Sequence, residues 1–110
     1  MKLVKCIVRT DKVELTTDAL KQLDVSGVTV TSVGGRGRAP NPIGLVRSTP
    51  YEIRYMPQMM IDVVVDDYLV DDVVRTVMNV AQTGQKGDGR VFVIPVEEAY
   101  TVRTRAGGSD

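Results

Sequence analysis

The stretch MIDVVVDDYLVDDVVRTVMNVA, residues 60–81, decides the fold of this 110-residue chain. Its first part, residues 60–65, is rich in β-branched side chains and predicts a strand. Valines then recur at helical spacing through residues 70–80, which predicts a helix with one apolar face. Asp66 and Asp67 stand between the two, where we expect them to cap the helix and complement its dipole. The segment is therefore a strand followed by an amphipathic helix.

The sequence TGQKGDGR, residues 83–90, joins this helix to a further strand predicted at residues 90–95. Its glycines permit positive φ angles and let the oxygens of a ligand approach backbone N–H groups. With Lys86 and Arg90 close by, such a turn suits a polyphosphate, although it lacks the G-x-x-x-x-G-K-[ST] spacing of a Walker A loop. A glycine-rich turn without a ligand is the alternative on these residues alone.

The N-terminal part of the chain has the same order of elements. Residues 2–9 predict a strand that is rich in valine and isoleucine. Asp11 is placed to cap a helix, which we expect to end near Asp24. Gly27 then opens a second strand at residues 28–33. The first strand, helix and second strand thus form one β-α-β unit.

Two other segments have weaker patterns. At the C-terminal end, we expect an extended piece at residues 100–104 and a tail that frays from about residue 105 to 110. Residues 34–54 contain glycines, prolines and four arginines, but Glu52 is their only acid. A loop of this length inside a compact domain is usually functional or disordered, and we expect it to be mobile when free.

The order β-α-β, long loop, β-α-β predicts an α+β fold of the split βαβ, ferredoxin-like type. The expected architecture is a βαββαβ sandwich in which two helices cover one face of an antiparallel sheet. The other face would be bare, and we expect it to carry apolar strand residues, namely Val28, Val30, Ile61, Val63 and Val65. Self-association is the simplest way to cover such a face.

The amino-acid composition excludes several classes of function. The chain has 14 Lys and Arg against 14 Asp and Glu, and this zero net charge argues against nucleic acid as the main partner. Because histidine is absent, Ser-His and Cys-His catalysis and histidine metal sites are excluded. The single cysteine, Cys6, is expected in the core, and a reducing compartment follows from cysteine usage. No run is long enough to span a membrane, so we expect no membrane insertion and a cytoplasmic location.

Several motifs, taken in order and spacing, are typical of one family. They are TVT at residues 29–31, GRGR at 35–38, Tyr51, YMP at 55–57, AQTG at 81–84, GDGR at 87–90, VFV at 91–93 and VRT at 102–104. On these motifs the chain resembles the PII signal-transduction family over nearly its whole length. The resemblance implies one PII-like domain at residues 1–110, with a mobile T-loop between the second and third strands at about residues 37–55.

The resemblance also implies a homotrimer with adenine-nucleotide sites for ATP and ADP between neighbouring subunits. One subunit would supply the phosphate-binding residues Gly35, Arg38, Gly87, Asp88, Gly89 and Arg90. Its neighbour would supply Thr29, Asp62, Val64 and Arg103. In this arrangement Thr29 and the backbone of Val64 would recognise adenine, and Arg103 would reach the phosphates, since arginine makes permanently charged, bidentate contacts.

The chain departs from the family pattern at positions that bear on the effector. Ala39 stands where the family typically has a glutamine that helps to hold a metal and 2-oxoglutarate. Gln58 stands where a lysine usually pairs with a carboxylate of 2-oxoglutarate, and Thr101 replaces a usual arginine. Asp62 replaces a usual glutamate. These changes favour a divergent member that senses nucleotides without 2-oxoglutarate, and they leave a role for Mg²⁺ and a second effector open.

Our first hypothesis is therefore a regulatory protein without catalytic residues, prosthetic group or resident metal. Its T-loop, with Arg47, Tyr51 and Arg54, would engage a target protein such as a membrane transporter or a metabolic enzyme. Tyr51 stands where many relatives carry a nucleotidylated tyrosine, but its neighbours do not match the usual surroundings. The alternatives are an ordinary nitrogen-regulatory PII protein that responds to 2-oxoglutarate and a small phosphate-handling enzyme. An RNA-binding sheet ranks last, because Phe92 is the only phenylalanine.

Overall fold

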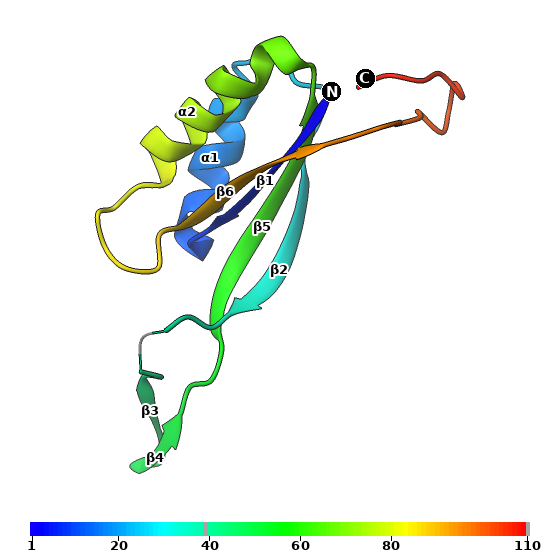
Figure 1. Ribbon diagram of the computed structural model, residues 1–110. Coiled ribbons are helices and arrows are strands. Elements are labelled where there is room, and N and C mark those ends of the chain that lie inside the picture. The colour runs from blue at the N-terminus through cyan, green and yellow to red at the C-terminus, as the bar shows by residue number, and fades with distance from the viewer. Residues whose placement is uncertain (39, 110) are drawn as a thin grey trace.

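The computed structural model describes residues 1–38 and 40–109, and its main feature is a four-stranded antiparallel sheet of order β2-β5-β1-β6. The strands are β1 (Lys2–Val8), β2 (Thr29–Gly35), β5 (Met56–Val65) and β6 (Gly89–Pro95). Helices α1 (Val13–Leu20) and α2 (Val70–Ala81) lie together on one face of this sheet (Figure 1). The α+β, ferredoxin-like fold predicted from the order of elements is confirmed.

The core lies between the sheet and the two helices. Alternate residues of β1 and β5 are buried there, as expected for strands with one covered face. From the helices, Val73, Val77 and Ala81 of α2 and Leu20 of α1 pack against them. The apolar face predicted for α2 is therefore the face that fills the core.

The residues of β5 that we assigned to the bare face of the sheet lie on its other face. Ile61, Val63 and Val65 are buried against the helices, with at most 2% of their surface exposed. The opposite face of β5 carries Asp62 and Val64 instead. Both phases of this strand contain apolar residues, so its sequence alone does not show which phase faces the helices.

The opposite face of the sheet is mixed in character. It carries alternate residues of the other strands, namely Leu3, Lys5, Ile7, Arg90, Phe92 and Ile94. Phe92 and Ile94 are 37% and 39% exposed in the isolated chain. The expectation that one face of the sheet is left uncovered by this chain therefore holds, although for residues other than those we named.

The capping predicted for both helices does not occur. A 3₁₀ turn precedes each helix, at Thr10–Lys12 and at Asp67–Leu69, and neither Asp11 nor Asp66 makes a capping hydrogen bond. Asp67 instead accepts hydrogen bonds from the N-terminal amine at 2.6 Å and from Lys2 Nζ at 2.9 Å. These two cations lower the pKa of Asp67 to about 2. Asp67 therefore binds groups that are distant in the sequence instead of the N–H groups at the start of its helix.

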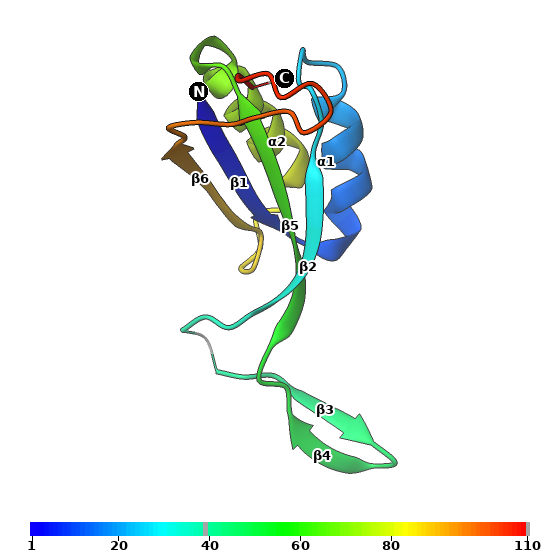
Figure 2. The same ribbon diagram turned by 90° about the vertical axis from the view of Figure 1, so that its right-hand side faces the viewer.

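The C-terminal segment also differs from the prediction, since residues 102–104 form a turn rather than an extended piece. The N–H of Arg105 donates to the carbonyl of Thr101 at 2.7 Å and thereby closes this turn. The chain then passes across the end of β5 (Figure 2), where Ser109 Oγ donates to Asp66 at 2.8 Å. The tail that we expected to fray is hydrogen-bonded through Ser109, and Asp110 lies outside the described residues.

Residues 36–38 and 40–55 project from the sheet as an arm that ends in a hairpin (Figures 1 and 2). Strands β3 (Ile43–Val46) and β4 (Thr49–Glu52) pair with each other and form a sheet of their own. Arg47 and Ser48 connect them with φ angles of 50° and 66°. We predicted no strands here, because glycine and proline obscure the alternation of a short hairpin. In residues 1–38 and 40–109, no helix is long and apolar enough to cross a membrane.

Candidate functional site

A cleft of about 820 Å³ lies between the glycine turn before β6 and the base of the projecting arm. The predicted site residues Gly35, Arg38, Gly87, Gly89 and Arg90 all line it. They come from the end of β2, from the start of the arm and from the junction of the turn with β6. The tertiary structure thus brings together two segments that are separated by about half of the chain.

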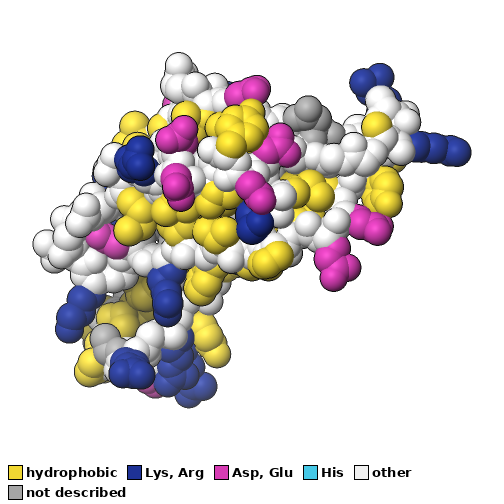
Figure 3. All heavy atoms as spheres, turned by 45° about the horizontal axis from the view of Figure 1, so that its top comes forward, with side chains coloured by type: hydrophobic (Ala, Val, Ile, Leu, Met, Phe, Trp, Pro, Cys, Tyr) yellow, Lys and Arg dark blue, Asp and Glu magenta, His cyan; other side chains and the backbone are white. Residues whose placement is uncertain are grey.

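The electrostatic character of the cleft is strongly positive. Its cationic side chains are Arg36, Arg38, Arg54, Lys86 and Arg90. No aspartate or glutamate is among the described residues that line it. Dark blue lysine and arginine side chains gather at this end of the molecule (Figure 3). Because cations converge on one concave surface, the cleft is suited to an anion with several charges.

One of these cations is held by an aromatic ring. The guanidinium carbon of Arg90 lies 5.2 Å from the centroid of the Phe92 ring. Both residues belong to β6, two positions apart, so they share a face of the sheet. A cation over an aromatic face is stabilised by the ring quadrupole, and this contact keeps Arg90 at the wall of the cleft.

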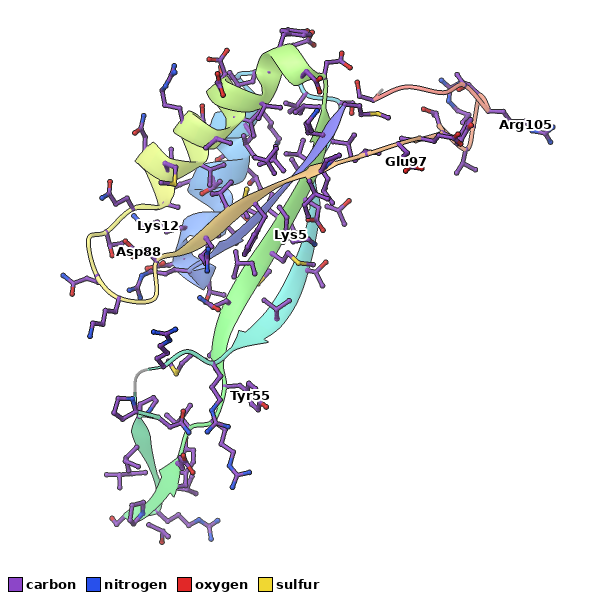
Figure 4. All side chains as sticks on the ribbon, in the orientation of Figure 1. Lys5, Lys12, Tyr55, Asp88, Glu97 and Arg105 are labelled. Atoms are coloured by element: carbon purple, nitrogen blue, oxygen red, sulfur yellow. The ribbon has the colours of Figure 1, made fainter. Side chains whose placement is uncertain are left out.

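The glycine turn is closed by the carboxylate of Asp88 (Figure 4). Its Oδ2 accepts hydrogen bonds from the N–H groups of Thr83 at 2.8 Å and Gly84 at 2.9 Å. Its Oδ1 accepts from the hydroxyl of Thr83 and from Arg9 Nε. These bonds stabilise the ionised form, so they hold the pKa of Asp88 well below its usual range. The carboxylate of Asp88 therefore orders the turn, and the residue does not line the cleft.

Arg9 is a site residue that our reading of the sequence missed. Its Nε lies 2.9 Å from Asp88 Oδ1, and its Nη2 donates to the carbonyl of Lys86 at 2.6 Å. Arg9 follows β1 directly, so it connects the central sheet to the glycine turn. No local signal in the sequence points to this contact, because its partners lie more than 70 positions away.

Gly89 is required at its position by the pairing of β6 with β1. Its φ angle is +103°, and a Cβ atom built there would lie 1.6 Å from the carbonyl oxygen of Ile7. The clashing atom belongs to the backbone of the paired strand, so it cannot move without breaking the ladder. The role of Gly89 is therefore first structural, since it lets β6 begin at the wall of the cleft.

Gln58 covers the end of β2 inside the cleft. A Cβ atom built on Gly35 would lie 1.9 Å from Oε1 of Gln58, so this glycine leaves room for the amide. The amide is neutral, although the residue lies among the cations of the cleft. Ala39, the other departure near this position, lies outside the described residues.

The remaining predicted site residues do not reach the cleft of their own chain. Thr29 and Asp62 are register partners on β2 and β5, and Val64 lies two residues beyond Asp62 on the same open face. Lys5 Nζ lies 3.1 Å from Asp62 Oδ1 on this face. Arg103 lies in the C-terminal turn, at the opposite end of the sheet from the arm (Figure 1). A single chain therefore gathers only part of the predicted site.

The three residues that we assigned to target binding lie along the arm. Arg47 is in the turn of the hairpin, and Tyr51 lies on β4 with its ring over Gly44. Arg54 is at the base of the arm, where it lines the cleft and approaches Glu52 at 3.8 Å. Arg54 therefore belongs to the cleft as well as to the arm. In the described part of the chain, no three acidic or cysteine side chains gather as a metal site would need.

The fold and the cleft together define an α+β protein with a cationic cleft beneath a projecting arm. The sequence model of the family "Nitrogen regulatory protein P-II" matches residues 1–106, and the chain belongs to this family of regulatory signal-transduction proteins. The family resemblance seen in the motifs is thereby confirmed.

Individual relatives support this assignment. The chain is 36% identical to the nitrogen regulatory protein P-II of Azospirillum brasilense over 110 residues, which cover 100% of the chain and 98% of the relative. It is 40% identical to nitrogen regulatory protein P-II 2 of Methanothermobacter thermautotrophicus, with 98% and 94% covered. It is 37% identical to nitrogen regulatory protein P-II 1 of Escherichia coli K12, with 94% and 93% covered.

Proposed function

We propose that this P-II family protein binds ATP and ADP competitively in the cationic cleft and signals the bound nucleotide to a target protein through the arm. One observation carries the proposal. The cleft is lined by the glycine turn on one side and by Pro42, Ile53 and Arg54 of the arm on the other. A ligand in the cleft therefore touches the element that would contact the target.

The phosphates of the nucleotide would lie against the glycine turn. Arg38, Lys86 and Arg90 supply charge there, and the N–H groups of Lys86 and Gly87 donate to no other described residue. The Asp88 carboxylate and Arg9 hold the turn in shape before any ligand arrives. A preformed turn loses less conformational entropy when the ligand binds, so these residues raise the affinity without touching the ligand.

A complete nucleotide site would need a second copy of the chain. In a homotrimer, the neighbour would bring Thr29 and the backbone of Val64 to the adenine and Arg103 to the phosphates. Two observations support this division of the site: Thr29 and Val64 lie away from the cleft of their own chain, and they share an open sheet face with the exposed Phe92 and Ile94. Association would remove that apolar surface from water.

The difference between ATP and ADP would act on the arm. A ligand shifts a conformational equilibrium only through different contacts in the two states. The γ-phosphate is the group that distinguishes ATP from ADP, and it would be contacted by Arg38, a cation of the cleft at the start of the arm. The arm would then present or withdraw Arg47 and Tyr51 from the target, such as a membrane transporter or a metabolic enzyme.

The neutral amide of Gln58 favours nucleotide sensing without 2-oxoglutarate. A dicarboxylate in the cleft would gain no cation from this residue, and its carboxylates would compete with the phosphates for the arginines. An ordinary nitrogen-regulatory protein that responds to 2-oxoglutarate is the alternative. The names of the relatives favour that alternative, whereas Gln58 opposes it.

Isothermal titration of the protein with ATP, ADP and AMP, each with and without 2-oxoglutarate and Mg²⁺, tests this proposal. We expect micromolar adenylate binding that 2-oxoglutarate does not strengthen. Arg90→Ala should weaken binding, while Arg75→Ala should not, because Arg75 lies on α2 beside Asp72 and away from the cleft. Strong enhancement by 2-oxoglutarate would establish the alternative. Hydrolysis of ATP during the titration, detected as release of inorganic phosphate, would indicate an enzyme.

A further inference from the structure

We propose that the outer edge of β3 binds an extended segment of a target protein, which joins the hairpin as a third strand and carries carboxylates. The proposal deepens the role of the arm in target binding and rests on that part of the proposed function. It does not depend on which nucleotide the cleft takes. Addition of a strand to a free edge is a general mode of peptide recognition.

The register of the hairpin shows which backbone groups point outward. β3 pairs with β4 through Ile43 and Glu52, Gly44 and Tyr51, Leu45 and Pro50, and Val46 and Thr49. Just before these pairs, the N–H of Ile53 donates to the carbonyl of Pro42 at 2.8 Å. Hydrogen-bonded and non-hydrogen-bonded pairs alternate in an antiparallel ladder. Ile43 and Leu45 are therefore in non-hydrogen-bonded pairs, and their N–H and C=O groups face away from β4.

The two edges of the hairpin are not equivalent. On β4 the residue opposite Leu45 is Pro50, which has no N–H to donate, so this edge is interrupted in its middle. On β3 both Ile43 and Leu45 keep their N–H groups, which donate to no residue that the structure describes. Only the β3 edge therefore offers a continuous row of donors and acceptors to an incoming strand.

Apolar side chains accompany the free edge. Ile43 and Leu45 lie on the same face of β3, because side chains alternate along a strand, and they are 65% and 70% exposed. Pro50 shares this face opposite Leu45. The other face is different: a Cβ atom on Gly44 would lie 2.5 Å from the ring of Tyr51, so that ring covers it. An added strand would place alternate apolar side chains beside Ile43 and Leu45.

The charge of the arm selects carboxylates on the incoming strand. Arg47 lies in the turn at the end of the hairpin and forms no ion pair with a described residue. Glu52 is the only acid in residues 40–55, and it already accepts a hydrogen bond from Asn41 and lies near Arg54. A lipid surface is less suitable than a protein strand, since backbone groups at a sheet edge lose their water in a bilayer without gaining partners.

The test begins with a random dodecapeptide library displayed on phage and selected on the full-length protein. Selected peptides are then titrated by fluorescence anisotropy against three variants. Leu45→Pro removes an outward N–H that the hairpin itself does not use, and Leu45→Val is its matched control. Pro50→Thr restores an N–H on the opposite edge. Amide exchange at Ile43 and Leu45 is measured by NMR in the unmodified protein, with and without peptide.

We expect peptides that alternate apolar and acidic residues. Their affinity should fall about tenfold in Leu45→Pro, as for loss of one backbone hydrogen bond, and should change little in Leu45→Val and Pro50→Thr. Bound peptide should protect both amides from exchange. If Leu45→Pro binds as well as the unmodified protein and neither amide is protected, the edge is not the docking site.

Two further experiments distinguish the reasons for which the proposal could fail. Deletion of residues 40–49 should abolish peptide binding. If the deletion abolishes binding but Leu45→Pro does not, the arm binds targets in another way, so this inference fails and the proposed function stands. If the deletion has no effect, the arm does not bind the selected peptides, and this inference fails together with the proposed role of the arm in target binding. Binding to phosphatidylglycerol vesicles that requires Leu45 would assign the tip to lipid and overturn the proposal.

Discussion

Arg9, directly after β1, and Asp88, directly before β6, form an ion pair with 2.9 Å between Nε and Oδ1. The two residues are 79 positions apart in the sequence. The same carboxylate binds the N–H groups of Thr83 and Gly84, so one side chain closes the glycine turn and fastens it to the sheet. The wall of the cleft is therefore ordered by a contact that no ligand needs to supply.

The pH dependence of the glycine turn should follow the titration of Asp88. The folded state lowers the pKa of this carboxyl, so its contribution to stability is complete above the unfolded pKa of about 4 and is lost as the pH falls below it. We expect the amide resonances of Thr83 and Gly84 to be constant from pH 7 to about pH 4 and to shift in stronger acid. NMR titration measures this change, and Asp88→Asn should abolish it. A midpoint near neutral pH would contradict the hydrogen bonding described here.

Substitution of Gly89 should destabilise the protein strongly. Gly89 has a positive φ angle, and Gly89→Ala places a Cβ atom against the backbone of Ile7. The two backbones cannot move apart without breaking the β1–β6 ladder. We expect a loss of about 3 kcal/mol in the free energy of unfolding, measured by urea denaturation. Gly37→Ala is the matched control, because no atom lies within 4 Å of a Cβ atom built there. Equal stabilities of the two variants would refute the steric role of Gly89.

Arg103 should contribute to nucleotide affinity although it is far from the cleft of its own chain. Arg103→Ala is expected to weaken ATP binding by about 1.5–3 kcal/mol, the usual value for a charge-assisted hydrogen bond. Calorimetry measures the affinity, and sedimentation should show that the substitution does not change the oligomeric state. The nearby Arg105→Ala serves as control for the loss of one positive charge. Unchanged affinity in Arg103→Ala would remove this residue from the site.

The arm should be dispensable for folding. Strands β3 and β4 pair only with each other, and their exposed side chains add nothing to the core. Deletion of residues 40–49 should therefore change the free energy of unfolding of the remainder by less than about 1 kcal/mol. Thermal denaturation followed by circular dichroism measures this. A large loss of stability would mean that the arm packs on the body of the protein.

Cys6 should be unreactive in the folded protein. It is fully buried on β1, and burial raises the pKa of its thiol to about 12, with a smaller contribution from the charge of Asp62. Labelling with a disulfide reagent at pH 8 should proceed only as fast as the protein opens. Labelling in urea provides the reference rate, and fast labelling of the native protein would contradict the position of Cys6 in the core.

Much of the fold could be predicted because its signals are local. The valines of α2 recur at helical spacing, and the strands around them are rich in β-branched residues, so the order of elements follows from short windows of sequence. The glycine turn was recognised in the same way. The motifs likewise led to the family that the comparison confirmed.

Apart from the missed hairpin, whose alternation is obscured locally, the errors share a physical cause, since they concern a choice between partners far apart in the chain. Asp67 is a residue type that commonly caps helices, yet its carboxylate accepts hydrogen bonds from the N-terminal amine and Lys2 instead. The residues of β5 that face the helices depend on how β5 pairs with β1. The C-terminal tail is held by the hydrogen bond from Ser109 to Asp66, and neither residue marks this contact locally.

The sequence by itself determined the order of the two helices and the four strands of the main sheet, the apolar face of α2, the family and the residues whose chemistry suits phosphate, because periodicity, glycine content and charge act over a few residues. Only the tertiary structure decided that Arg9 fastens the glycine turn, that the arm is a hairpin with one open edge, and that the cleft joins this arm to the turn. These features depend on strand pairing and side-chain contacts between distant segments, which are fixed only when the chain is folded.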